Sequence, residues 1–185
     1  MPAAAYRPLT AHDYRELPEY GPRYQLIEGD LHMAPAPNRF HQGILIFLAG
    51  EFTIYLKQNQ IGKVYAGPFD VYLSDLNVYQ PDLSYFSKER YCYLTDEGAN
   101  GAPDLVVEIL SPSTSKYDLG VKRDVYARTG VLEYWIIDPM ARVVKVYNLE
   151  ENADTPIATL RSGRKLASAL LPGLSIGVTE LFNAS

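Results

Sequence analysis

The run from Leu105 to Leu110 restricts the fold of this 185-residue chain more than any other feature. All of its residues are apolar except Glu108. A strand that is apolar on both faces is usually buried inside a sheet, and a lone buried carboxylate is costly unless a charge or a metal ion lies beside it. The sequence therefore predicts an interior strand over 104–110 and a partner for Glu108 on a neighbouring element.

Composition places the chain among ordinary globular proteins, with 47% hydrophobic and 21% charged residues. The length predicts one domain over residues 1–185. The formal net charge of -5 gives no basic footprint over the whole molecule. Contact with nucleic acid would therefore require a local basic patch, because the electrostatic field of the whole molecule is negative and repels phosphates.

Cysteine usage and hydropathy predict a cytoplasmic protein. Cys92 is the only cysteine, which excludes an intrachain disulfide and a cysteine-based zinc site. The first ten residues have neither the basic nor the apolar region of a secretory signal. The longest apolar run, "ILIFLAG" at 44–50, is far shorter than the roughly 20 residues that span a membrane. We therefore expect no membrane contact.

Hydrophobic periodicity predicts strands and helices that alternate along the chain. This favours an α/β (α+β mixed) fold in which one mixed sheet is covered by helices. Helices are expected over 10–20, 40–57 and 114–128, strands over 62–74, 81–87 and 104–110, and hairpins over 23–34 and 133–148. Asn38 is the expected N-cap of the second helix. Ser113 or Thr114 is expected to cap the third, which ends at Gly130.

The partner of Glu108 must come from another strand. Asp104 lies four residues before Glu108, so the two are about 13 Å apart along a strand and cannot share one metal ion. Directly opposed residues on neighbouring strands approach to about 5 Å. Asp82, in "QPDLSYF", opens a strand of suitable length. With the carbonyl of Ile109, Asp82 and Glu108 would form an all-oxygen site suited to Mg²⁺ or Mn²⁺. The alternative is that these acids are solvated or capping groups.

Lys122 is expected on the inward face of the helix over 114–128. Lys122 lies three residues after Leu119, three before Val125 and four before Tyr126, so these residues share a face. Lys122 could pair with Asp118 one turn earlier. Alternatively, its ammonium could reach the two carboxylates and orient a water molecule or offset charge on a phosphate. Spacing alone leaves both interpretations open.

Several common catalytic and ligand-binding motifs are absent from the sequence. No Gly-x-Ser-x-Gly elbow, phosphate-binding loop or dinucleotide fingerprint occurs in the chain. His12, His32 and His41 do not have metal-ligand spacing. His41 stands at the start of the helix over 40–57, so it either belongs to the helix cap or lines the site.

Long stretches of the chain resemble a known family. The segments "RYQLIEGDLHMAPAP", "QPDLSYF", "APDLVVEILSPST", "YARTGVLEYWIIDP" and "LLPGLSIGVTELF" are similar to those of the Uma-type family, which is classed with restriction endonucleases. That family is similar in fold to the PD-(D/E)XK nuclease superfamily. The resemblance implies a restriction-endonuclease-like fold, with a central mixed sheet flanked by helices.

The resemblance also implies site residues. Asp82 resembles the motif aspartate of the superfamily, and Glu108 resembles the acid of its E-x-K element. The lysine of that element would fall at Leu110, which cannot replace it. Some superfamily members carry this lysine on the following helix, which here corresponds to Lys122. Gln25 stands where relatives have a glutamate.

The resemblance leaves the first-helix acid of other nucleases with two candidates, Glu28 and Glu51. The function that it implies is an endonuclease that depends on Mg²⁺ (or Mn²⁺) and hydrolyses phosphodiester bonds in DNA. Two alternatives stay open: a catalytically inactive nuclease-fold module for binding or assembly, and a metal-dependent hydrolase of a small phosphoester. A homodimer is also expected, with the "EYWIIDP" hairpin as a candidate edge.

Overall fold

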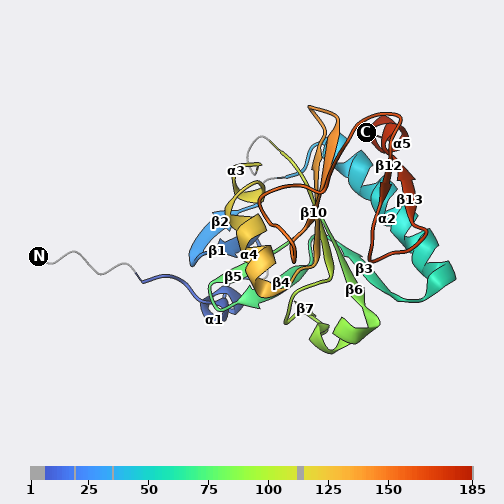
Figure 1. Ribbon diagram of the computed structural model, residues 1–185. Coiled ribbons are helices and arrows are strands. Elements are labelled where there is room, and N and C mark those ends of the chain that lie inside the picture. Colours follow the sequence, from blue (N-terminus) through green and yellow to red (C-terminus); the bar gives the residue numbers. More distant parts are fainter. Residues whose placement is uncertain (1–6, 19, 35, 112–114, 185) are drawn as a thin grey trace, which may run out of the picture.

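The computed structural model describes residues 7–18, 20–34, 36–111 and 115–184 (Figure 1). Its elements are α1 (Ala11–Arg15), β1 (Tyr24–Ile27), β2 (Asp30–Met33), α2 (Arg39–Asn59), β3 (Gly62–Ala66), β4 (Asp70–Ser74), β5 (Asn77–Tyr79), β6 (Leu83–Ser87), the 3-10 helix η1 (Lys88–Tyr93), β7 (Gly98–Ala99), β8 (Leu105–Ile109), α3 (Ser115–Asp118), α4 (Val121–Thr129), β9 (Glu133–Asp138), β10 (Val143–Asn148), β11 (Ala158–Leu160), β12 (Lys165–Ala167), β13 (Ser175–Gly177) and α5 (Val178–Asn183). No helix in these ranges is long and apolar enough to cross a membrane.

The strands form two larger sheets and a short hairpin. The six-stranded sheet has the order β11-β10-β9-β8-β6-β3, and the five-stranded sheet has the order β2-β1-β5-β4-β7. Both are mixed, because β8 and β9 run parallel, as do β4 and β7, whereas their other pairs are antiparallel. The predicted mixed sheet with flanking helices is confirmed. The second, five-stranded sheet was not predicted.

Strand β8 is interior, as its apolar run predicts, and helices cover both of its faces. Leu105, Val107 and Ile109 belong to a core shared with α2, β9, β10 and the C-terminal elements. Val106 belongs to a second core with Val125 of α4. Figure 1 shows α2 and α5 on one side of the sheet and α4 on the other. Because strand residues alternate between faces, Glu108 points to the α4 side with Val106.

Three predicted local features are confirmed. Helix α2 begins after Asn38, whose side chain accepts a hydrogen bond from the backbone N–H of His41. The hairpin of β9 and β10 turns at 139–142, and Asp138 accepts a bond there from the N–H of Ala141. The predicted caps Ser113 and Thr114 lie outside the described residues. Gly130 ends α4 in the left-handed region, as predicted.

Three predictions about elements were wrong. The helix over 114–128 is two helices, α3 and α4, which meet at Gly120. Leu119 therefore points outward and is 39% exposed, instead of lying on the buried face with Lys122. The strand over 62–74 turns at Gly67 and Pro68, so β3 and β4 enter different sheets. Finally, β9 is paired on both sides, so "EYWIIDP" supplies no sheet edge for a dimer.

Candidate active site

Asp82 and Glu108 lie opposite each other on neighbouring strands. β6 and β8 are antiparallel, with Leu83 paired to Val107. Asp82 is the residue before Leu83 and Glu108 the residue after Val107, so the two acids stand at the same end of this strand pair. Asp104 is engaged elsewhere: its carboxylate accepts a 2.6 Å bond from the N–H of Ser87 and forms a 3.0 Å ion pair with Arg90.

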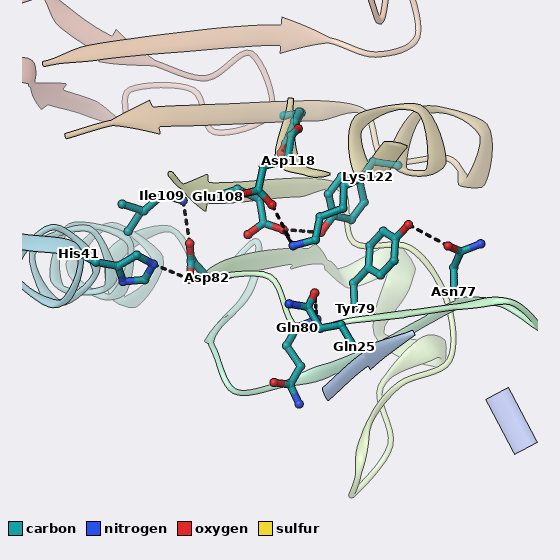
Figure 2. A network of polar contacts seen from close by, with 12 residues as sticks. Gln25, His41, Asn77, Tyr79, Gln80, Asp82, Glu108, Ile109, Asp118 and Lys122 are labelled. Atoms are coloured by element: carbon teal, nitrogen blue, oxygen red, sulfur yellow. Dashed lines mark hydrogen bonds and ion pairs between the residues drawn. The ribbon is translucent and has the colours of Figure 1, made fainter. Parts of the chain in front are cut away.

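The carboxylate of Asp82 is held from two directions. Its Oδ2 accepts a 2.7 Å hydrogen bond from the backbone N–H of Ile109, and its Oδ1 lies 3.0 Å from Nε2 of His41 (Figure 2). His41 is a buried residue in the first turn of α2. Helix α2 and strand β8 therefore both orient Asp82. Of the two roles predicted for His41, the structure places its ring against Asp82, while its backbone N–H serves the cap.

Glu108, Lys122 and Asp118 form a buried ionic group. Lys122 Nζ lies 3.0 Å from Oε1 of Glu108 and 3.0 Å from Oδ1 of Asp118. The exposed fractions are 4% for Glu108, 2% for Lys122 and 1% for Asp118. The hydroxyl of Tyr126 donates a 2.7 Å bond to the same Oε1 of Glu108. Lys122 thus pairs with Asp118, one of the two interpretations of its spacing, and also reaches one of the two predicted site carboxylates, Glu108.

Burial and charge shift the pKa values of this group. Burial raises the pKa of Glu108 to about 8, although the ammonium of Lys122 lowers it. Burial lowers the pKa of Lys122, but the charges of Glu108 and Asp118 raise it by more. Because Asp118 is as close as Glu108, the ammonium has an anionic partner whichever protonation state Glu108 adopts. Burial likewise lowers the pKa of His41, and the hydrogen bond and charge of Asp82 raise it overall.

These residues line a pocket of about 570 Å³. Its wall contains Asp82, Glu108, Asp118 and Lys122, together with His41 and the backbone of Ile109. The rest of the wall includes carboxamides and Arg23. The volume lies within the range of small-molecule sites, roughly 300–1,000 Å³. The pocket therefore places acidic oxygens, a buried lysine and amide groups around a space that admits a ligand.

Comparison with known proteins assigns the family. The model of the Uma2 family, described as "putative restriction endonuclease", matches residues 11–179. The chain belongs to the Uma2 family. It is 24% identical over 186 residues to an uncharacterized protein of Synechocystis sp., a match that covers 98% of this chain and 95% of that one. Its fold matches the crystal structure of "a putative nuclease belonging to DUF820" from Anabaena variabilis, with a TM-score of 0.79, 23% identity and coverage of 96% and 99%.

Where the E-x-K pattern implied by the resemblance would place a lysine, this Uma2 chain has Leu110. Leu110 packs beside the apolar cluster on the α4 side of the sheet, so it provides no charge. Lys122 of α4 brings an ammonium to Oε1 of Glu108 instead. The break at Gly120 matters here, because α4 begins at Val121 and so sets Lys122 in its first turn.

The structure separates the other candidate acids from the pocket. Glu28 lies in the β1–β2 turn, where its carboxylate accepts bonds from Asn77 and Arg128. Glu28 and Glu51 are not among the residues that line the pocket. Gln25 does line it, and its Oε1 accepts a 3.1 Å bond from the N–H of Gln80. Gln25 therefore occupies the site region without adding a charge.

Sequence reasoning missed several residues of this Uma2 pocket. Tyr126 was placed on the correct helix face, but nothing assigned its hydroxyl to Glu108. Its spacing of four residues from Lys122 is the signal that could have found it. Arg23, Gln42 and Gln80 line the pocket, whereas Tyr126 contacts Glu108 without being one of the lining residues. Arg23 and Gln80 open two of the segments that resemble the family, but nothing in the sequence assigned their side chains to a pocket.

Proposed function

We propose that this protein is a metal-dependent nuclease that hydrolyses phosphodiester bonds in DNA. The observation that carries the proposal is the opposition of Asp82 and Glu108 across adjacent strands at a pocket wall, with Lys122 at 3.0 Å from Glu108. Membership of the Uma2 family and the fold match support it. The proposed metal ion is Mg²⁺ or Mn²⁺, held by Asp82, Glu108 and the carbonyl of Ile109.

The charges and donor atoms at the site fit a divalent cation. Three carboxylates, those of Asp82, Glu108 and Asp118, line the pocket, and the basic groups against them are Lys122 and His41. A cation would offset the negative charge and favour the ionised form of Glu108. In the described ranges, no three His, Cys, Asp or Glu side chains form a metal-ligand cluster. The donor set thus fits Mg²⁺, which commonly takes one or two carboxylates and completes its shell with water and phosphate oxygens.

Each residue has a defined part in the proposed reaction. A bound Mg²⁺ would supply Lewis-acid chemistry at the phosphate and acidify a water molecule. His41 and the N–H of Ile109 hold the Asp82 carboxylate in one orientation. Lys122 offers N–H donors beside Glu108, where they can orient a water molecule or offset charge that develops on the phosphate. Asp118 keeps Lys122 charged, and Tyr126 fixes Glu108.

A cleavage assay tests the proposal. Supercoiled, linear and single-stranded DNA are incubated with the protein and Mg²⁺ or Mn²⁺, and EDTA provides the metal-free control. We expect cleavage that requires the metal, and we expect Asp82→Ala and Glu108→Ala to abolish it. Glu150→Ala is the matched control, because Glu150 is exposed and does not line the pocket. Robust cleavage by the double variant Asp82→Ala/Glu108→Ala would overturn the assignment.

A hydrolase of a small phosphoester is the second candidate, favoured by the pocket volume of about 570 Å³. Nucleotide monophosphate esters tested beside DNA separate the two functions. Turnover of the small esters without cleavage of DNA would select this second function. Absence of all turnover, together with no metal binding, would select a non-catalytic module.

A homodimer also belongs to the proposed function, and α2 supports it. Ile46 and Ile54 are 69% and 60% exposed on this helix. Each lies four residues from Gly50, so in an antiparallel pair of α2 helices centred on Gly50, Ile46 of one copy meets Ile54 of the other. Sedimentation velocity tests this arrangement. We expect a dimer that Ile46→Glu dissociates and that Ile157→Glu, at an exposed site on another segment, leaves intact.

A further inference from the structure

A strip of aromatic and basic residues extends from the pocket along the edge strand β3. β3 is the last strand of the six-stranded sheet. The residues that follow it, Gly67 and Pro68, line the pocket. Lys63 and Tyr65 alternate along β3 with Val64, which packs beside the α2 core. The two side chains therefore share the opposite face of the sheet.

Aromatic rings on this face are stacked in a fixed arrangement. The rings of Tyr65 and Phe69 are parallel within 8°, with centroids 4.5 Å apart. Both meet the buried ring of Phe86 edge-on, at 6.1 and 6.2 Å. Phe86 thus supports the stack from below, while Tyr65 and Phe69 remain partly exposed. Rings ordered before binding lose little entropy when a flat ligand stacks on them.

Two lysines provide positive charge beside the rings. Lys63 is exposed, and its Nζ lies 5.0 Å from the centroid of the Tyr91 ring. Lys88 is also exposed, and its backbone N–H bonds to the carbonyl of Ile61, which places it next to the start of β3. The overall charge is -5, and these two lysines supply the positive charge that lies beside the rings. The β3 strip is defined here as Lys63, Tyr65, Phe69, Lys88 and Tyr91.

We infer that the β3 strip binds single-stranded nucleic acid and guides it to the pocket. Aromatic faces that stack bases, next to cations that contact phosphates, are the chemistry of single-strand recognition. In a duplex the bases already stack on one another, so they cannot stack on Tyr65 or Phe69. Since Gly67 and Pro68 join the strip to the pocket wall, one strand can occupy both. The inference rests on the proposed function only where the strip meets the pocket. Binding of a single strand along the strip itself requires no cleavage.

Binding of DNA in EDTA tests the strip without the reaction. The probe is a fluorescein-labelled oligothymidylate, followed by anisotropy and compared with a duplex of the same length. Tyr65→Leu and Phe69→Leu keep apolar packing against Phe86 and remove the flat ring. We expect each to weaken single-strand binding by about 5- to 150-fold, which corresponds to the about 1–3 kcal/mol found for one stacked base. Lys63→Gln should weaken binding and reduce its salt dependence.

Matched controls carry the same chemical changes on other surfaces. Phe47→Leu alters α2, which packs on the opposite face of the sheet, and Lys165→Gln alters β12. Both should bind like the wild-type protein.

Strip variants that bind oligothymidylate with unchanged affinity would overturn the inference, as would a duplex that binds as tightly and loses affinity in the same variants. Binding that depends on the β3 strip, without cleavage of any DNA, would support the strip as a binding surface and contradict the proposed nuclease function. Cleavage with an unchanged KM in every strip variant would support the proposed nuclease function and contradict substrate binding by the β3 strip.

Discussion

Asp82 accepts a hydrogen bond of 2.7 Å from the backbone N–H of Ile109, the residue that follows Glu108. This bond joins the two strands at the point where their acids face the pocket. It gives Asp82 a structural role in addition to its proposed role as a metal ligand. The two roles predict different results for different substitutions of Asp82.

Asp82→Asn keeps one oxygen that can accept the Ile109 bond, and its amide N–H can donate to Nε2 of a neutral His41, but the negative charge is removed. Its unfolding free energy should stay close to that of the wild-type protein, whereas metal-dependent cleavage should be lost. Asp82→Ala leaves the N–H of Ile109 without this acceptor, so it should also lose about 1–3 kcal/mol of stability. Urea unfolding and the DNA cleavage assay measure the two effects. An asparagine variant as unstable as the alanine variant would show that the charge of Asp82, and not its hydrogen bond, supports the fold.

Lys122 should be essential to stability because it compensates buried acids. Lys122→Met leaves Asp118, which is 1% exposed, with no cation beside it. Breaking a buried ion pair in this way costs about 3–5 kcal/mol. The double variant Lys122→Met/Asp118→Asn should recover much of the loss, since the uncompensated charge is gone. The control Lys116→Met should change stability by less than about 0.5 kcal/mol. Equal stabilities for the single and double variants would contradict the pairing with Asp118.

The sequence predicted the interior strand and its acid because their pattern is local. An apolar run with one glutamate indicates a buried strand whichever elements surround it. Asp82 could be found because strand geometry excludes Asp104 and favours a neighbouring strand. The hairpins over 24–33 and 133–148 were also predictable, since turn residues separate their strands.

The contacts that orient the site could not be predicted in the same way. The contact of His41 with Asp82 depends on where the first turn of α2 packs against β6, which no spacing along the chain encodes. The β5 strand, Asn77–Tyr79, has only three residues, too few to show a period of two. The helix break at Gly120 was missed because apolar spacing continues across it in the sequence. Leu119 is exposed as a consequence.

Divalent metal should stabilise the folded protein through Glu108. A ligand that binds only the native state at 100 times its Kd adds about 2.7 kcal/mol to stability. For a chain of this size that corresponds to a rise in Tm of about 5–11 °C. Thermal unfolding with increasing Mg²⁺ measures the effect.

Glu108→Gln should remove most of this stabilisation by metal. The amide still has an oxygen for the Tyr126 hydroxyl and Lys122, but it carries no charge to desolvate. In EDTA above pH 8, the variant should therefore melt at or above the wild-type temperature. With metal added it should gain little. A full metal-induced rise in the Tm of both Glu108→Gln and Asp82→Asn would place the cation elsewhere.

Glu133 predicts a pH dependence of stability that is separate from the pocket. This residue of β9 is buried, and it accepts hydrogen bonds from Nε1 of Trp135 and from the hydroxyl of Ser168. Burial raises its pKa above the ordinary value of 4.5, although both bonds lower it. Between pH 4.5 and the raised pKa, the folded state therefore binds more protons than the unfolded state. Stability must fall as pH rises through that window and level off above it.

The side chain of Glu133→Gln does not titrate. The difference in unfolding free energy between wild type and variant therefore isolates the contribution of Glu133 to the pH dependence of stability. In urea unfolding at a series of pH values, the wild-type protein should lose stability relative to Glu133→Gln as pH rises from 4.5. Ser168→Ala should enlarge the loss, because one of the hydrogen-bond donors that favour the carboxylate is gone. The opposite sign, with wild type gaining on Glu133→Gln as pH rises, would mean that the bonds from Trp135 and Ser168 outweigh burial and hold the pKa of Glu133 below 4.5.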